Sequence, residues 1–490
     1  MGVDPSVLHR DPDGKSLEET RLLGGIRSAR IAEQEETRQN EPARDAELSD
    51  RAFAFCGSDA IEFSERERTF GIYVIGKTGS GKTVALENSA LLDIDAGKAL
   101  VFFDPHGDAA RSIMASIPRH RAEKICYLDL SDMNSVAWNP FADVPPNKAA
   151  LAAINLTDAL KDIWPDTWGE RLASFLRNGF QLLIEHGHAT LRDLPRLYYD
   201  KEHRERFTQR IQDPALNDFW NGEYKSYDDR QRREAQGPIL NRIGQLLAIP
   251  EIRSVVSHRR STLNIRTAID NGYSIIVNLS KGTTGRTPSS VFGSLLASSI
   301  KTALMAREDS PQNQRPPLAF YADEFHNYGT LAWAEMLSEC RKYGLQLTLA
   351  HQFTGQLHKD VLSAVLGNTD TLIVFRVGIE DANLLAPALE TGPLMYDRSR
   401  LAYIQPENIP PHRLTNQPPF HACIRRGIDH CYIETAPPFP SLDRYSRNVL
   451  SSQRRFAPQP EARGSFCARI SRPRLRRPAS NFRDLLNHNP

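Results

Sequence analysis

A glycine-rich stretch over residues 73–83 has the composition and spacing of a phosphate-binding loop. It reads YVIGKTGSGKT and contains the pattern G-x-x-x-x-G-K-[ST]. An apolar run over residues 70–75 precedes the loop, and a helical pattern over residues 84–94 follows it. Strand, loop and helix in this order are the context in which the pattern binds a nucleoside triphosphate. We expect the contacts to come from Gly76, Lys77, Thr78, Gly79, Ser80, Gly81, Lys82 and Thr83.

Each residue type of this loop has a physical task. Glycine lets the backbone turn tightly, so that its N–H groups face phosphate oxygens. The helix that follows presents its positive dipole end to the same anion. Lys82 is expected to reach the β- and γ-phosphates, and the Thr83 hydroxyl is expected to bind Mg²⁺. The sequence therefore predicts ATP as the nucleotide and Mg²⁺ as the metal ion.

Two adjacent carboxylates end a second apolar run, over residues 318–322. Asp323 is placed to bind Mg²⁺ beside Thr83, and Glu324 is placed to polarise the attacking water as a general base. An acidic strand end on its own is more often a solvated surface. The phosphate loop upstream favours the catalytic interpretation.

Three further side chains are candidates for the hydrolysis step. Gln352 ends the apolar run before it and is suited to bind the γ-phosphate or the water; a surface amide is the alternative. Phosphoryl transfer also needs a cation, often an arginine from a neighbouring subunit. Arg341 lies at a predicted helix C-terminus, where a cation is also favoured for structural reasons. Arg376 ends the strand predicted over residues 371–375 and could instead pair with Glu380 or Asp381.

The segment DPHGD over residues 104–108 ends the strand predicted over residues 99–103. We expect this strand to lie next to the strand of the phosphate loop, with its polar end at the ligand-binding edge of the sheet. A loop close to phosphate or DNA and a plain turn, with Asp108 capping the next helix, are equally compatible with the sequence.

Strand and helix patterns divide the chain into parts. Buried strands alternate with helices over residues 51–144 and 262–436, which predicts an α/β core with a mostly parallel sheet. Residues 145–261 show helical periods and no strand signal, so we expect an inserted all-helical domain. Residues 1–50 are predicted to be a flexible acidic arm, and residues 437–490 a disordered tail rich in Pro and Arg.

Charge is distributed unevenly although the net charge of the 490 residues is only +1. Residues 451–490 hold nine arginines against two acidic residues, a net charge of +7, so the rest of the chain sums to −6. Such a basic segment could either grip DNA or be a solvated tail.

Cysteine usage and hydropathy point to the cytoplasm. The six cysteines are scattered, and we interpret them as reduced thiols. His421, Cys423, His430 and Cys431 could suggest a metal site, but alternation over residues 420–433 around Arg426-Gly427 favours a β-hairpin. No stretch holds the roughly 20 consecutive apolar residues of a membrane helix. We expect no direct membrane insertion, with any attachment to the inner membrane made through partners.

These motifs, taken in order, resemble the HerA–FtsK superfamily of ring ATPases. The series continues with AWNP over residues 137–140, IVNLSKG over 276–282, DEF over 323–325, LSECRKYG over 337–344, AHQ over 350–352 and the stretch from Gly367-Asn368 to Phe375-Arg376. The likeness is strongest to the TraG/TraD-type coupling ATPases of conjugative type IV secretion and covers residues 60–435.

The resemblance implies a RecA-like P-loop motor domain, a homohexameric ring and ATP-driven pumping of DNA, bound largely without regard to sequence. It assigns Arg341 to the subunit interface and so ranks it above Arg376. It also implies a relaxase or secretion-channel proteins as partners. The chain departs from the family in having no N-terminal membrane helices and in having His326 where Gln is expected.

Three alternatives to a DNA pump remain open at this point. The chain could be a HerA-like DNA-processing translocase, or a coupling ATPase that acts mainly on protein through the helical insert. A nucleotide-dependent scaffold without motor function is disfavoured by the presence of Glu324.

Overall fold

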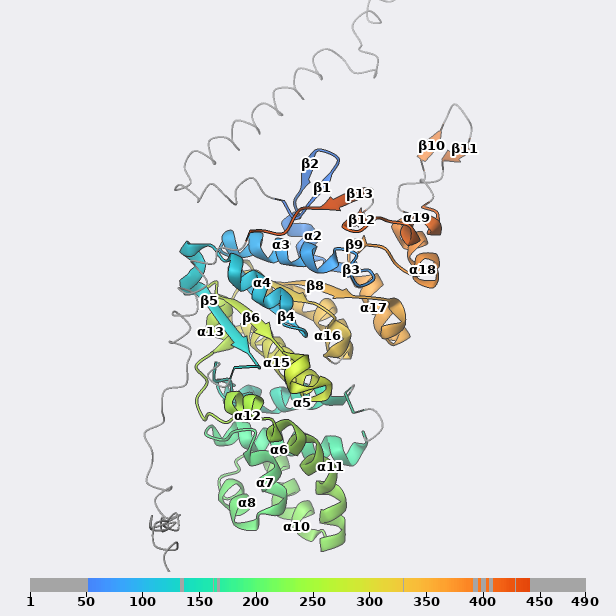
Figure 1. Ribbon diagram of the computed structural model, residues 1–490. Helices are drawn as coiled ribbons and strands as arrows, with labels where there is room; N and C mark the ends of the chain where they lie inside the picture. Colours follow the sequence, from blue (N-terminus) through green and yellow to red (C-terminus); the bar gives the residue numbers. More distant parts are fainter. Residues whose placement is uncertain are drawn as a thin grey trace, which may run out of the picture.

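The computed structural model describes residues 52–440, apart from 133–135, 162, 165–167, 329, 391–394, 398–401, 405–408 and 428. The arm predicted over residues 1–50 and nearly all of the predicted tail lie outside the described residues. Within the described part, a large sheet lies above a stack of helices (Figure 1).

An 11-stranded sheet organises the described chain, in the order β2-β1-β13-β12-β9-β3-β8-β7-β4-β6-β5. Its strands are β1 (Ala54–Cys56), β2 (Asp59–Ile61), β3 (Ile72–Ile75), β4 (Ala99–Asp104), β5 (Ile125–Asp129), β6 (Ser274–Asn278), β7 (Leu318–Ala322), β8 (Leu345–His351), β9 (Thr371–Val374), β12 (His421–Arg426) and β13 (Asp429–Thr435). The seven strands from β9 to β5 in this order run parallel, and β12 joins them antiparallel to β9. The predicted mostly parallel α/β sheet is confirmed. A separate two-stranded pair consists of β10 (Met395–Asp397) and β11 (Ala402–Ile404).

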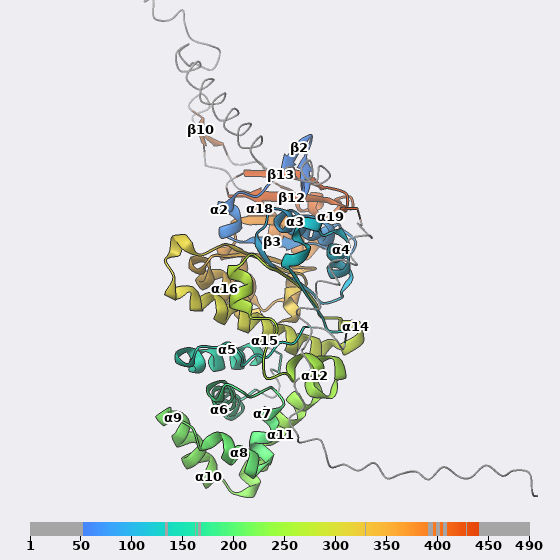
Figure 2. The ribbon, with the colours of Figure 1, turned by 90° about the vertical axis from the view of Figure 1, so that its left-hand side faces the viewer.

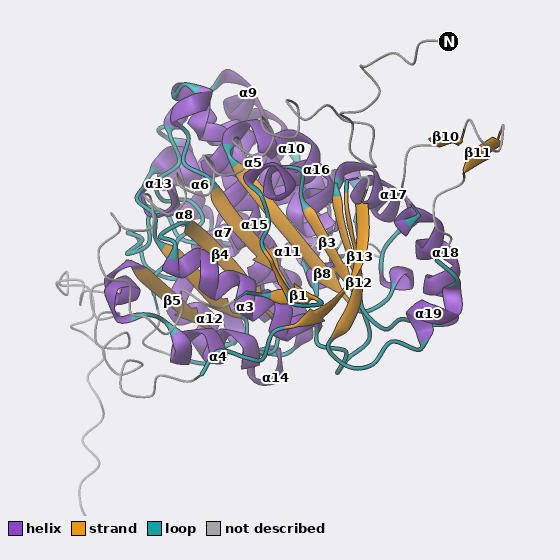
Figure 3. Cartoon of the chain, turned by 90° about the horizontal axis from the view of Figure 1, so that it is seen from above, coloured by secondary structure: helices purple, strands orange, loops and turns teal. Residues whose placement is uncertain are grey.

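Helices cover both faces of the parallel strands, as Figure 3 shows from above. They are α2 (Glu65–Thr69), α3 (Lys82–Asp95), α4 (Asp108–Ser116), α13 (Ile265–Asp270), α14 (Lys281–Thr284), α15 (Arg286–Met305), α16 (Thr330–Glu339), α17 (Lys359–Asn368), α18 (Ile379–Leu389) and α19 (Pro411–Thr415). Short 3₁₀ turns include η8 (Phe325–Asn327), η9 (Cys340–Tyr343) and η10 (Thr354–Gln356).

Strand β3 shows why its sequence is apolar without alternation. Ile72 and Val74 point into the cluster that contains the buried residues of α3 and α4. Tyr73 and Ile75 point the other way, into the cluster formed by α15, α16 and α17. Because successive side chains of a strand face opposite sides, a sheet covered on both faces needs apolar residues at every position.

Residues 146–256 form a layer of helices below the sheet and contain no described strand. The helices are α5 (Ala149–Lys161), α6 (Glu170–His186), α7 (Asp193–Tyr199), α8 (Lys201–Thr208), α9 (Pro214–Asn217), α10 (Tyr224–Ser226), α11 (Asp229–Ala248) and α12 (Pro250–Val256), with a π-helix over Asp218–Glu223. Figure 2 shows α15, α5 and α6 as successive layers. Buried side chains of α5 and α6 share one apolar cluster with α15.

The helical layer leaves and rejoins the core at one place. The N–H of Trp138 donates to the carbonyl of Val255 at 3.1 Å, and the N–H of Thr262 donates to the carbonyl of Ala137 at 2.9 Å. The segments before and after the helices therefore run side by side, as is usual where an element is inserted into a loop. The domain boundaries at residues 145 and 261 stay a prediction.

The hairpin predicted around Arg426-Gly427 is confirmed. Strands β12 and β13 pair antiparallel, from His421 opposite Glu434 to Arg426 opposite Asp429. This hairpin extends the parallel sheet beyond β9 and carries β1 and β2 at its outer edge. Among the described residues, no helix combines the length and the apolar character that crossing a bilayer requires.

One prediction about the sheet is wrong. Strand β4, which ends at Asp104, does not neighbour the phosphate-loop strand; β7 and β8 lie between β4 and β3. Strands that are consecutive in the chain are thus separated in space, and the polar end of β7 comes closer to the loop than the end of β4.

Candidate nucleotide-binding site

The phosphate loop, the two predicted carboxylates and Gln352 come from the carboxyl ends of three adjacent strands. The loop over residues 76–81 leaves β3 and enters α3, Asp323 and Glu324 follow β7, and Gln352 follows β8, which lies between them. Because parallel strands end at the same edge of a sheet, side chains hundreds of residues apart converge there.

Close packing explains two of the loop's glycines. A Cβ at Gly76 would lie 2.5 Å from the Cβ of Phe375 and 2.8 Å from the hydroxyl of Ser80. Gly81 has φ of +105°, and a Cβ there would lie 2.8 Å from the Cα of Phe420. Neither position accepts a side chain without moving a neighbouring backbone.

The loop presents polar groups that have no hydrogen-bond partner among the described residues. The hydroxyl of Ser80 is buried without a hydrogen-bond partner there. The N–H groups of Gly79, Gly81 and Lys82 donate to no acceptor in the described part of the chain, and no side chain caps α3. Unpaired N–H groups at a helix N-terminus form a natural anion-binding site.

Lys82 is the electrostatic centre of the site. Its Nζ lies 2.9 Å from Oδ1 of Asp323 and 3.1 Å from Oε1 of Glu324, and the Lys82 side chain is only 5% exposed. Burial alone would lower the pKa of Lys82, but the two carboxylates hold the pKa above its usual value. A cation held in this way can move from the carboxylates to the phosphate oxygens of an incoming nucleotide.

Oxygen ligands suitable for Mg²⁺ lie beside this lysine. The hydroxyl of Thr83 is 3.5 Å from Oδ2 of Asp323, so both could contact one ion. Two further carboxylates, Glu87 and Asp104, lie nearby. The pKa of Glu87 is raised to about 7 by burial, by the charge of Asp104 and then by that of Asp323. The residues present fit a divalent cation.

Glu324, which contacts Lys82, has a strained backbone conformation. Its φ is +48°, a left-handed conformation that costs free energy in a residue other than glycine. Oε1 accepts hydrogen bonds from Lys82 and from Nε2 of Gln352, the latter at 3.1 Å. The structure thus brings Gln352 into contact with the proposed base, whereas the sequence only predicted that both lie near the phosphate.

The DPHGD segment forms a capped turn. Asp104 accepts from the N–H of His106 at 2.8 Å and from that of Ala110 at 2.9 Å. Helix α4 begins at Asp108, and its N-cap residue is Gly107. The prediction that Asp108 caps the helix is therefore wrong, because the buried Asp104 side chain reaches the first turn instead.

The two candidate arginines lie at opposite ends of the parallel strands. Arg376 follows β9 beside the loop, and its carbonyl accepts from the N–H of Lys77 at 2.8 Å. In the described residues, no ion pair joins it to Glu380 or Asp381. Arg341 stacks its guanidinium 4.2 Å from the ring centre of Phe70, next to the start of β3. Only Arg376 is therefore close to the loop within one chain.

Some residues of the site carry no signal in the sequence. Phe420 packs on Gly81, has φ of +65°, and donates its N–H to the carbonyl of Ser80 at 2.7 Å. Phe375 packs on Gly76. Phe375 and Phe420 lie about 300 and 340 residues after the loop, so only the folded sheet reveals these contacts.

A groove of about 550 Å³ adjoins the loop on the β9 side. Its lining includes Lys77 and Thr78 from the loop, Phe353 after β8, and Ile379 at the start of α18. Phe353 is 48% exposed and Ile379 is 59% exposed, so both present apolar surface.

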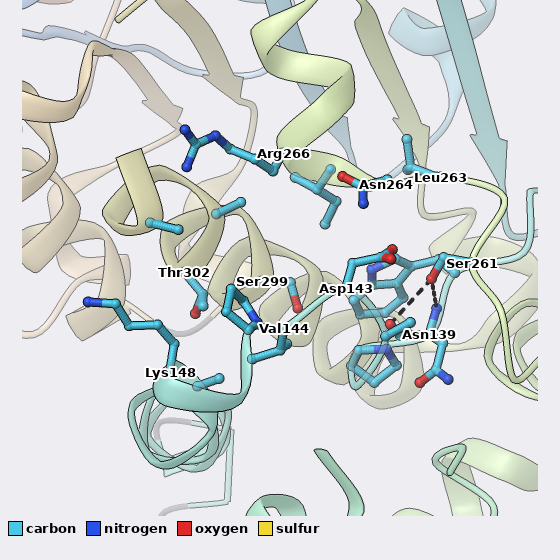
Figure 4. A pocket seen from close by; sticks show the side chains of 18 of the residues that line it. Asn139, Asp143, Val144, Lys148, Ser261, Leu263, Asn264, Arg266, Ser299 and Thr302 are labelled. Carbon is cyan, nitrogen blue, oxygen red and sulfur yellow. Dashed lines mark hydrogen bonds between the residues drawn. The ribbon is translucent and has the colours of Figure 1, made fainter. Parts of the chain in front are cut away.

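A second, larger cavity of about 710 Å³ lies away from the loop, among α5, α13 and α15 (Figure 4). Several of its polar side chains are already paired. Lys148 contacts Glu308, Arg266 contacts Asp309, and Ser261 bonds to the backbone of Asn139. We therefore place the candidate site at the loop and not in this cavity.

Sheet order, loop and carboxylates together define a P-loop NTPase. The strand that ends in the carboxylates is separated from the loop strand by one strand, β8, which ends in Gln352. Residues 58–386 match the family described as the type IV secretion-system coupling protein DNA-binding domain. The chain belongs to this family, which confirms the resemblance seen in the sequence.

Solved structures show the same fold. The bacterial conjugative coupling protein TrwBdeltaN70 in its unbound form aligns with a TM-score of 0.58 and 16% identity over 82% of this chain and 92% of that one. TrwB in complex with ADP and Mg²⁺ aligns with a TM-score of 0.57 and 17% identity, over 82% of this chain and 92% of that one. VirB4 of Thermoanaerobacter pseudethanolicus aligns with a TM-score of 0.50 and 10% identity, over 79% of this chain and 96% of that one. A comparison with curated protein sequences finds no significant match.

Changing Gly81 to alanine should damage the loop. The φ of +105° and the 2.8 Å approach to Phe420 leave no room for a Cβ, so we expect a loss of stability of about 1–3 kcal/mol and weaker nucleotide binding. Thermal unfolding and equilibrium binding of ATP measure the two effects. Gly367→Ala is the matched control, since a Cβ there meets open space. Equal behaviour of the two variants would contradict this description of the loop.

Proposed function

We propose that the protein is an ATP-hydrolysing motor that moves DNA in type IV secretion. The observation that carries the proposal is the contact of Lys82 with Asp323 and Glu324 beside a loop of unpaired N–H groups. Family membership supports DNA as the substrate. Relatives of the same fold have been solved with ADP and Mg²⁺ and with a non-hydrolysable ATP analogue.

Each residue of the site has a proposed role. Gly76 to Thr83 hold the triphosphate, with Lys82 at the β- and γ-phosphates. Thr83 and Asp323 bind Mg²⁺, which neutralises phosphate charge when bound. Glu324 takes the proton of the attacking water, and Gln352 holds the water or the γ-phosphate. The groove beside Lys77, with Phe353 and Ile379, offers an apolar surface for the nucleoside.

Hydrolysis also needs a cation at the transferring phosphoryl group, and the two candidates are Arg341 and Arg376. Arg341 lies at the opposite end of β3 from the loop, so within one chain it is far from the nucleotide. We propose that Arg341 acts on the nucleotide of a neighbouring subunit in a homohexameric ring. Arg376, beside the loop, is the second candidate and would act within its own subunit.

Mixed rings test the assignment of Arg341. When Arg341→Ala subunits are mixed with wild-type subunits, we expect ATPase activity to fall more steeply than the fraction of variant, because each variant subunit disables a neighbour. Steady-state ATPase rates at a series of mixing ratios measure this. The same series with Arg376→Ala should fall in proportion. A proportional decline with Arg341→Ala would contradict a role across subunits.

The transported substrate is tested by the response to DNA. We expect duplex or single-stranded DNA of unrelated sequences to stimulate ATP hydrolysis, and the stimulation to weaken with salt, because phosphate contacts release counterions. ATPase rates with and without DNA, beside a native mass measurement, check this and the ring. A protein-only substrate predicts no stimulation by any DNA. We propose a relaxase or a secretion-channel protein as the partner that connects the motor to the secretion system.

A further inference from the structure

A chain of polar side chains leads from the core of the sheet to the free oxygen of Glu324. Its members are Tyr73 on β3, His351 at the end of β8, Gln356 in η10 and His326 in η8. The hydroxyl of Tyr73 lies 2.5 Å from Nε2 of His351, and Nδ1 of His351 lies 3.2 Å from Oε1 of Gln356. Nε2 of Gln356 lies 3.2 Å from Nε2 of His326.

The backbone fixes the orientation of the Gln356 amide. Its Oε1 accepts from the N–H of Gln352 at 3.0 Å and from that of Phe353 at 3.2 Å. Backbone N–H groups can only donate, so this atom must be the oxygen and the other the NH₂ group. The NH₂ group must then donate to Nε2 of His326. That ring nitrogen carries a lone pair, and the proton of the neutral imidazole is on Nδ1.

The same reasoning orients His351. Its Nδ1 faces the oxygen of Gln356 and must donate, so its Nε2 accepts the hydroxyl proton of Tyr73. Burial lowers the pKa of His351 to about 3 and that of His326 to about 4, so each ring holds one proton at neutral pH. In this series of side chains, each member therefore donates its hydrogen bond to the next member, in the direction of Glu324.

The chain ends at an oxygen without a partner. Nδ1 of His326 lies 3.5 Å from Oε2 of Glu324, and both atoms are buried with no hydrogen bond among the described residues. The other oxygen, Oε1, already accepts from Lys82 and Gln352. The N–H of His326 needs only a small approach to hold the second oxygen.

We propose that His326 is a positioning residue for Glu324, and that Gln356 keeps the His326 ring in the Nδ1–H tautomer that this requires. With Oε2 held, Oε1 is turned toward the nucleotide, where a general base must stand. The proposal rests on the hydrolytic function proposed for the site. It gives His326 a task at the position where the family resemblance leads one to expect Gln.

A matched pair of variants tests the positioning. His326→Asn keeps an N–H donor at the place of Nδ1, whereas His326→Leu has nearly the same volume and no donor. We expect His326→Leu to lower kcat by about 10- to 100-fold with the KM for ATP unchanged, since a misplaced catalytic group costs rate and not binding. His326→Asn should stay close to wild type. Equal rates for the two variants would overturn the proposal.

Two further measurements separate positioning from folding and from the proposed function. In a Glu324→Gln background, His326→Leu should lower kcat no further, because both changes act on the same group; an additional loss of equal size would overturn the proposal. Nitrogen-15 NMR of histidine-labelled wild-type protein, with His326→Asn to assign the signal, should show Nδ1–H. The Nε2–H tautomer would overturn it. The NMR measurement of the tautomer needs no ATPase activity. If the proposed function is wrong, this shows separately, because the wild-type protein does not hydrolyse ATP.

Discussion

Replacing Lys82 with alanine is expected to abolish ATP hydrolysis. The lysine is the cation that contacts both Asp323 and Glu324 and the group placed to stabilise charge on the phosphates. Removing one donor of this kind commonly costs 10²–10³-fold in rate, and the lysine also contributes to binding, so we expect a loss of about 10³-fold or more. Steady-state ATPase assays and equilibrium binding of ATP measure the two parts.

The same change should also weaken the fold, which the experiment must separate from catalysis. Asp323 and Glu324 are each 5% exposed, and without Lys82 their charges are left buried and unpaired. Breaking a buried pair in this way costs about 3–5 kcal/mol. Lys82→Arg keeps the charge and should unfold closer to wild type while remaining inactive. Lys359→Ala removes an exposed lysine and should have no effect on either. Substantial hydrolysis by folded Lys82→Ala would refute the proposed role.

Replacing Glu324 with glutamine should separate ATP binding from hydrolysis. The amide keeps the size of the side chain and can still accept from Lys82 and Gln352, but it cannot take a proton. We expect hydrolysis to slow by about 10²–10⁴-fold, the usual contribution of a general base, with ATP affinity preserved. Single-turnover hydrolysis and equilibrium binding on the same protein give both quantities.

The control for this variant lies on the next helix. Glu339→Gln removes an exposed carboxylate near the end of α16 and should leave both quantities unchanged. If Glu324→Gln hydrolyses ATP at the wild-type rate, Glu324 is not the base. If it fails to bind ATP, the carboxylate acts in binding and the assignment of roles within the site is wrong.

Local patterns predicted the central strands and the loop because their signals are local. The run Leu318–Ala322 and the run before the loop are apolar at every position, which is typical of strands buried on both faces. The loop shows its pattern G-x-x-x-x-G-K-[ST] within eight consecutive residues, so finding it needs no knowledge of distant contacts. These parts of the site could be read directly from residue types and spacing.

The order of the strands could not be predicted in the same way. The strand that ends at Asp104 follows the loop strand in the chain, yet β7 and β8 pair between them. Pairing depends on which apolar faces meet in the folded core, and neighbouring strands in sequence need not be neighbours in the sheet. For this reason the sequence wrongly predicted that the strand ending at Asp104 pairs with the loop strand.

Contacts between distant residues were also invisible in the sequence. The hydrogen bond of Phe420 to Ser80 and that of Tyr73 to His351 join residues about 280–340 positions apart. Single side chains such as Gln356 acquire their role from geometry, because only the fold shows which of its amide atoms meets a donor. His326 was noticed as an unusual residue, but its contact with Glu324 required the structure.

The most direct test is an experimental structure of the protein with Mg²⁺ and a non-hydrolysable ATP analogue. We predict the triphosphate within the loop over Gly76–Thr83, with Lys82 moved from the carboxylates to the phosphates and the metal ion between Thr83 and Asp323. A nucleotide bound elsewhere, with Lys82 still paired to Asp323 and Glu324, would contradict the account.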